Sequence, residues 1–149
     1  MITERKKLGN AGEELAARFL MEKGYVLLGR NVQMSHHEVD IVMRDGNCLV
    51  FVEVKTRRSD WFVDPIRAVD DEKLWNLLEA AKMYKHEHPE CYRMEFRIDV
   101  VCVVGDVQTC SQVEHYISPF ERRILAGTPW KAHYRKLRKG HYGYYRMGR

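Results

Sequence analysis

The sequence lacks any long hydrophobic run. The longest uninterrupted apolar stretches, Cys48–Val52 and Val100–Val104, have five residues each. A helix that crosses a bilayer needs about 20 apolar residues, so we expect no membrane-spanning segment. The N-terminal residues pass from charge directly into an amphipathic pattern, without an apolar signal region or a small-residue cleavage site. These absences predict a cytoplasmic protein that does not bind membranes.

A disulfide framework is also absent. The four cysteines form neither a CxxC pair nor a regular spacing, and Cys48 and Cys102 lie inside apolar, strand-like runs. A buried thiol in such a run acts as a small hydrophobic side chain. We therefore expect the cysteines to be reduced and structural.

Acidic residues are missing from the end of the chain. All 21 lie at or before Glu121, where they face 16 Lys and Arg, so residues 1–121 carry a formal charge of 16 − 21 = −5. The last 28 residues, Arg122–Arg149, hold nine Lys and Arg and five aromatic residues. Such a segment is either an arm that binds a polyanion, with aromatic rings that stack on bases, or a solvated extension. The arm interpretation assigns nucleic-acid contacts to Arg122, Arg123, Lys131, Arg135, Lys136, Arg138 and Lys139.

A chain of 149 residues fits one domain, which we place at residues 1–120, followed by a basic, aromatic extension over residues 121–149. Hydrophobic periodicity in the domain alternates between helical and strand spacing. These patterns predict an α/β fold with two helices packed on a mixed central sheet. The expected helices are 8–23 and 70–87, and the expected strands are Tyr25–Val32, Glu38–Arg44, Cys48–Lys55, Phe96–Val104 and Val113–Ile117.

One acid-x-Lys triplet has an unusual context. The spacing occurs three times in the chain, but only Glu53-x-Lys55 follows an apolar strand, Leu49–Val52. A charge in a buried strand needs a counter-charge or a metal ion. Because side chains alternate along a strand, Glu53 and Lys55 share one face.

The preceding turn decides what Glu53 meets. A two-residue turn at Asp45-Gly46 pairs Arg44 with Asn47 and places Asp40 diagonal to Glu53, at roughly 7 to 8 Å. A four-residue loop would put Asp40 directly opposite Glu53, at roughly 4.5 to 5.5 Å. A three-residue loop would move the two carboxylates to different faces. An even loop length thus brings two carboxylates within reach of one cation.

Two carboxylates and an ammonium group on one face suit phosphodiester hydrolysis. Carboxylate oxygens are the ligands that Mg²⁺ (or Mn²⁺) prefers, and such a cation keeps positions for water and a phosphate. Lys55 could orient or deprotonate the attacking water, or balance charge in the transition state. The alternative is a surface hairpin on which these residues only make cross-strand ion pairs.

Several segments together resemble a known family. Asp40 followed by Glu53-x-Lys55 resembles the core of the PD-(D/E)xK nucleases of the restriction-endonuclease-like fold. The wider pattern is similar to the YraN family of predicted bacterial endonucleases, over roughly residues 9–120. The segments that match are Gly9-x-x-Gly12-Glu13-x-x-Ala16, Gly24-Tyr25, Asn31, Glu38-Val39-Asp40, Val50-Phe-Val-Glu-Val-Lys55, Lys73 and Arg97-Ile-Asp99-Val-Val101.

The resemblance implies a role for each matching residue. It implies that Asp40, Glu53 and the backbone carbonyl of Val54 bind the metal, and that Lys55 is the catalytic lysine. Glu13 matches a helical acid that related Holliday-junction resolvases use as a further metal ligand, while its neighbour Glu14 is expected to face solvent. Lys73, at the start of the second helix, matches a position that could contact a phosphate.

We therefore expect a Mg²⁺-dependent endonuclease that acts on DNA, with branched or repair intermediates as candidate substrates. Two other classes remain open: a nucleic-acid-binding module that keeps the fold without turnover, and a protein–protein adaptor that uses the apolar loop Trp61-Phe-Val63. Trp61 and Phe62 could also form the interface of a homodimer.

Overall fold

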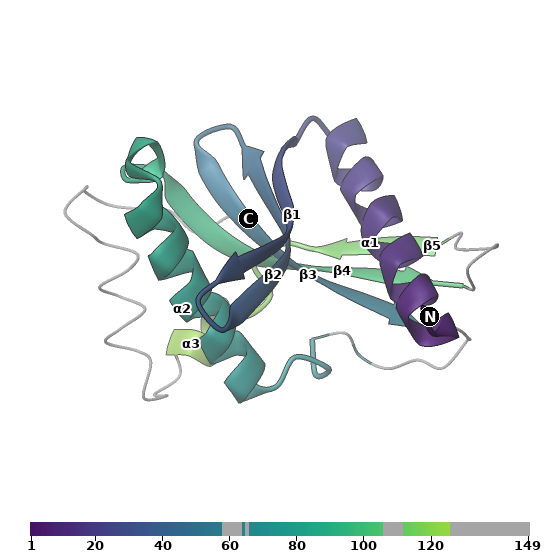
Figure 1. Cartoon of the computed structure of the whole chain (residues 1–149). Coiled ribbons are helices and arrows are strands. Elements are labelled where there is room, and N and C mark those ends of the chain that lie inside the picture. The colour runs from purple at the N-terminus through teal and green to yellow at the C-terminus, as the bar shows by residue number, and fades with distance from the viewer. Residues whose placement is uncertain (58–63, 65, 106–111, 126–149) are drawn as a thin grey trace.

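A computed structural model of the 149-residue chain describes residues 1–57, 64, 66–105 and 112–125. Five strands and two long helices build the molecule (Figure 1). The elements in chain order are α1 (Glu4–Glu22), β1 (Val26–Met34), β2 (His37–Asp45), β3 (Cys48–Arg57), α2 (Asp71–Glu87), the 3₁₀ turn η1 (Pro89–Cys91), β4 (Glu95–Val104), β5 (Gln112–Tyr116) and α3 (Glu121–Leu125).

The strands form one mixed sheet in the order β1-β2-β3-β4-β5. Among the described strands only β3 and β4 run parallel to each other, and α2 lies between them in the chain, as a crossover connection requires. One face of the sheet packs against α2 through Leu49 and Phe51, and the other packs against α1 through Val50 and Val52. Figure 1 shows α1 and α2 at either side of the sheet. The predicted α/β architecture is thus confirmed.

Helix α1 begins four residues earlier than the hydrophobic pattern predicts. The side chain of Thr3 caps the helix by accepting a hydrogen bond from the backbone N–H of Lys6 at 3.2 Å. The exposed first turn carries no apolar signal, which is why periodicity alone misses it. Past the other end, Gly24 adopts a left-handed conformation with φ of 94°, as expected for a residue that stops a helix.

The turn between β2 and β3 lies one residue later than predicted. Asp45 pairs with Cys48 and Arg44 with Leu49, so the turn residues are Gly46 and Asn47, and the predicted pairing of Arg44 with Asn47 is wrong. Gly46 has a φ of 58°, which suits the first position of a tight hairpin turn. Asp45 stays in the strand because its carboxylate pairs with Arg97 at 3.0 Å.

A buried ionic cluster joins β4 to its neighbours. Arg97 donates through Nε to Asp99 at 3.0 Å and through another nitrogen to the Tyr25 hydroxyl at 2.7 Å. His115 of β5 lies 2.7 Å from Asp99. Asp99 is thus a structural partner of Arg97, and it lies beside Val52 in the β3–β4 register.

Three further features complete the fold. Cys48, Cys91 and Cys102 are free and buried, as predicted, and Cys110 lies outside the described residues. In the described part of the chain, no helix is long and apolar enough to cross a membrane. Helix α3 buries Ile124 in the core on the α2 side, so the packed body extends into the first residues of the segment predicted as an extension.

Candidate metal centre at the end of the hairpin

Asp40 and Glu53 occupy facing positions where the β2–β3 ladder ends. The last pair of that ladder is Ile41 with Val52, so Asp40 and Glu53 are the next residue on each strand. The Asp40 carboxylate accepts a hydrogen bond of 2.8 Å from the backbone N–H of Val54. Because the turn lies one residue later, the β2–β3 register shifts by two residues, which keeps both carboxylates on one face and places them opposite each other instead of diagonally.

Glu53 is almost completely buried, with 5% of its surface exposed. Its Oε1 lies 3.3 Å from the Lys55 ammonium and its Oε2 lies 3.5 Å from Lys73, which reaches in from the first turn of α2. Among the described residues, however, Oε2 accepts no hydrogen bond. A buried carboxylate oxygen that accepts no hydrogen bond is costly even with an ammonium group 3.5 Å away, and it marks a place where a cation or water would be stabilising.

The proximity of Glu53 also affects how readily Asp40 ionises. Burial, followed by repulsion from Glu53, raises the pKa of Asp40 to about 7, although the hydrogen bond from Val54 opposes the shift. A carboxyl group with such a pKa holds a proton near neutrality and releases it when a cation arrives.

Helix α1 brings a third acid to this place. Burial, followed by repulsion from Asp40, raises the pKa of Glu13. The close packing of α1 on β3 depends on Gly12, because a Cβ atom there would lie 2.1 Å from Oγ1 of Thr56 on β3. Glu14 is exposed and pairs with Arg18 at 3.4 Å, which confirms that it faces solvent.

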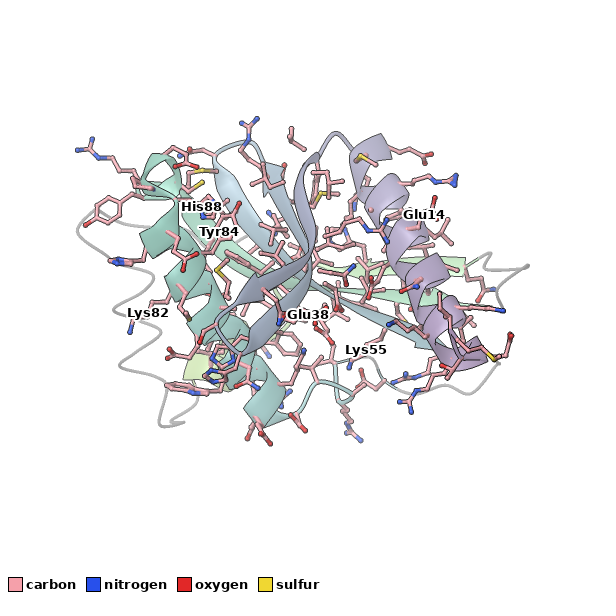
Figure 2. The ribbon with its side chains drawn as sticks, in the orientation of Figure 1. Glu14, Glu38, Lys55, Lys82, Tyr84 and His88 are labelled. Atoms are coloured by element: carbon pink, nitrogen blue, oxygen red, sulfur yellow. The ribbon has the colours of Figure 1, made fainter. Side chains whose placement is uncertain are left out.

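Strand β1 contributes Asn31, which the sequence marks only as part of a motif. Asn31 lies between the pairs Arg30–Ile41 and Val32–Val39, which puts it opposite Asp40. With its nitrogen facing the acids, the Asn31 amide donates to Glu13 Oε2 at 3.1 Å and to Glu38 Oε1 at 3.2 Å. Figure 2 shows Glu38 and Lys55 in the part of the sheet between α1 and α2. The signal in the sequence was the match of Asn31 to the family motif.

The cations predicted to contact nucleic acid are only partly described. Lys73 lies at the candidate site, whereas Arg122 is exposed on α3. Arg123 forms an ion pair of 2.8 Å with Asp71 and so helps to dock α3 on the start of α2. The other predicted contacts, Lys131, Arg135, Lys136, Arg138 and Lys139, lie outside the described residues.

The donor set fits a hard divalent cation that is held loosely. Within residues 1–57, 64, 66–105 and 112–125, no three His, Cys, Asp or Glu side chains already lie close enough together to encircle an ion. Mg²⁺ does not need such a cage, since it binds through one or two carboxylates and fills its other positions with water and phosphate. The carboxylates of Asp40 and Glu53, with an Oε2 of Glu53 that accepts no hydrogen bond, match that requirement.

Comparisons with other proteins place the chain in a family. The model of Uncharacterised protein family UPF0102 matches residues 12–103, which is more than half of the chain. The chain belongs to this family. A UPF0102 protein of Syntrophomonas wolfei is 41% identical over 115 residues, which cover 77% of this chain and 98% of the relative. One from Streptomyces griseus is 41% identical over 74% of this chain and 93% of its own length. UPF0102 protein LI0223 of Lawsonia intracellularis is 35% identical over 77% and 86%.

The range matched by UPF0102 includes every acid and lysine of the candidate site and ends within β4. The basic segment after residue 121 lies outside it. The family match therefore covers the candidate site and does not cover the basic segment.

Proposed function

We propose that this UPF0102 protein is an endonuclease of the PD-(D/E)xK type that hydrolyses phosphodiester bonds in DNA with the help of Mg²⁺ or Mn²⁺. We also propose that the chain has the restriction-endonuclease-like fold and is of the YraN type, as the motifs imply. Branched or repair intermediates are the substrates that the resemblance favours.

One observation carries the proposal. Asp40 and Glu53 occupy facing positions at the end of a ladder, Glu53 is buried with one oxygen that accepts no hydrogen bond, and Lys55 lies beside it at 3.3 Å. A surface hairpin with incidental ion pairs would leave its acids in water, where their repulsion costs little. Here burial raises the free energy of two adjacent charges, and a divalent cation would offset that cost.

Each residue has a role that its position allows. Asp40, Glu53 and the Val54 carbonyl would hold the cation, with Glu13 as a further ligand. When bound, such a cation supplies Lewis-acid stabilisation of the scissile phosphate and an attacking water that loses its proton near neutral pH. Lys55 can donate a hydrogen bond to the attacking water or to a phosphate oxygen as negative charge develops. Lys73, whose ammonium lies 3.5 Å from Glu53 at the start of α2, can contact a neighbouring phosphate.

The test is cleavage of duplex, flap, junction and single-stranded DNA with Mg²⁺ or Mn²⁺ by the wild type, Asp40→Asn and Glu53→Gln. We expect each substitution to abolish cleavage and to leave DNA binding unchanged or stronger, because removing a negative charge reduces repulsion of phosphate. Glu14→Gln on the outer side of α1 is the matched control and should cleave at the wild-type rate. Cleavage that persists in EDTA, or in the Asp40 and Glu53 variants, would rule out the proposal.

A nucleic-acid-binding module without turnover is the second candidate. The two lysines beside Glu53 favour it, since they already neutralise part of the charge that a cation would need. This alternative predicts no cleavage of any of the four substrates and DNA binding that is independent of Mg²⁺. It also predicts that Asp40→Asn changes neither property.

A further inference from the structure

We propose that Asn31 is the positioning residue of this site: its amide joins Glu13 of α1 to Glu38 of β2 and so holds Glu13 beside Asp40. The inference rests on the proposed function, because it assumes that Asp40 and Glu53 bind a divalent cation. Asn31 thereby raises the affinity for the cation above the value that the carboxylates alone would give.

The backbone at Asn31 has an unusual conformation. Its φ of 50° lies in the left-handed region, which costs free energy for residues with a side chain and which Asn tolerates better than most. Glycine would adopt this conformation more readily, so backbone geometry alone does not account for Asn at this position. The side chain must be considered as well.

The side chain has two carboxylate partners from different elements. The amide lies 3.1 Å from Glu13 and 3.2 Å from Glu38, and Glu13 is part of a helix that meets the sheet at Gly12. Two carboxylates this near Asp40 repel each other, and without a shared donor they would move apart into solvent. The amide bridges them with hydrogen bonds to charged acceptors, which are stronger than neutral ones.

A neutral donor is the suitable kind of bridge here. A lysine or arginine at position 31 would also hold the two acids, but its charge would repel a divalent cation at Asp40 and Glu53. The buried Oε2 of Glu53, which accepts no hydrogen bond in the described part of the chain, is an independent indication that a cation belongs at this place. Asn31 can therefore organise the acids without competing with that cation.

The experiment measures binding of Mn²⁺ alone, by the loss of the electron paramagnetic resonance signal of the free ion, together with the melting temperature. Asn31→Gly keeps the backbone conformation and removes the amide. We expect it to weaken Mn²⁺ binding by roughly 10- to 100-fold, as is common for residues that orient metal ligands, while the melting temperature without cation stays at or near the wild-type value. Asn31→Ser, which keeps one donor, should bind Mn²⁺ with an affinity between those of the wild type and Asn31→Gly.

A double-mutant cycle shows whether the effect passes through Glu13. Glu13→Gln should weaken Mn²⁺ binding, and adding Asn31→Gly to it should weaken binding far less than in the wild-type background. Additive losses would overturn the positioning role, as would wild-type affinity in Asn31→Gly. Failure of the wild type to bind Mn²⁺ would instead overturn the proposed function, and this inference with it. The control Glu14→Gln, next to Glu13 on the exposed side, should bind Mn²⁺ like the wild type.

Discussion

At the scale of single residues, Asp40 gives the protein a specific pH dependence. Its pKa of about 7 in the folded protein, against an ordinary value of 3.8, means that the folded state binds the proton more tightly than the unfolded chain. Without a cation, ionisation of Asp40 should therefore cost stability as pH rises from about 4 to about 7. We expect the melting temperature of the wild type to fall, relative to Asp40→Asn, between pH 5 and pH 8. An equal change in both proteins would contradict this assignment.

The same proton competes with the cation. Below pH 7, Mn²⁺ must displace it, so affinity should decrease by up to about tenfold per pH unit, and above pH 7 it should level off. Titrations with Mn²⁺ at pH 6, 7 and 8 measure this effect. An affinity that does not change with pH would show that Asp40 is ionised throughout, and it would remove the reason for linking its burial to cation binding.

Substitutions of the two lysines beside Glu53 should have different effects on cleavage and on DNA binding. Both Lys55→Gln and Lys73→Gln remove a positive charge near the carboxylates, so each should raise Mn²⁺ affinity several-fold. Only Lys55 lies on the strand face with Glu53, and its loss should lower the cleavage rate at saturating Mn²⁺ and DNA by roughly 10²-fold or more. Lys73→Gln should instead weaken DNA binding and leave that rate within about tenfold. Equal losses of rate would show that the roles are shared.

At the scale of elements, the packing of α1 on β3 controls where Glu13 lies. Gly12→Ala would place a methyl group against Thr56, and we expect it to destabilise the fold by about 1 to 3 kcal/mol. Gly9→Ala is the matched control one turn away, where a Cβ atom meets nothing within 4 Å. That change should stabilise the fold by up to about 1 kcal/mol, because Ala is the better helix former. Thermal or urea unfolding of both variants measures these effects, and Gly12→Ala/Thr56→Ala tests whether removing the clash restores part of the stability. Equal effects at the two glycines would contradict the prediction.

The β2–β3 hairpin shows which parts of the site could be predicted. The alternation of Glu38–Arg44 and the apolar run before Glu53 determine which side chains share a face, so the placement of Asp40 on the same face as Glu53 and Lys55 was predictable. The turn position was not, because it depends on the long-range ion pair between Asp45 and Arg97. The later turn shifts the β2–β3 register by two residues, so every side chain keeps its face, and Asp40 and Glu53 still lie on one face.

Contacts between elements that are distant in the chain could not be predicted either, because they too depend on long-range packing. Lys73 of α2 reaches Glu53, and Asn31 of β1 joins Glu13 to Glu38, yet no local pattern marks these pairs. Periodicity reports which face of its own element a residue occupies, and it does not report which residue of another element it meets. The family resemblance did select Asn31 and Lys73, although it gave no geometric reason for Asn31.

At the scale of the whole molecule, charge is divided between the packed body and the basic segment. Residues 1–125 carry 18 − 21 = −3, and residues 126–149 carry seven Lys and Arg and no acid. If the basic segment supplies long-range attraction to DNA, each phosphate that it neutralises contributes about 0.9 to the slope of log K against log salt concentration. Contact by about half of the seven cations would then amount to a slope of roughly 3.

The last prediction concerns truncation after Leu125. This end point keeps Ile124 in the core and Arg123 paired with Asp71, so α3 should remain docked. We expect the truncated protein to keep its melting temperature within a few degrees, to lose roughly 3 from the salt slope of DNA binding, and to cleave saturating DNA at nearly the full rate. Truncation after Phe120 is the comparison, because it also removes Ile124 and should lower the melting temperature. An unchanged salt slope with a large loss of melting temperature after the Leu125 cut would show that the basic segment stabilises the body and does not attract DNA.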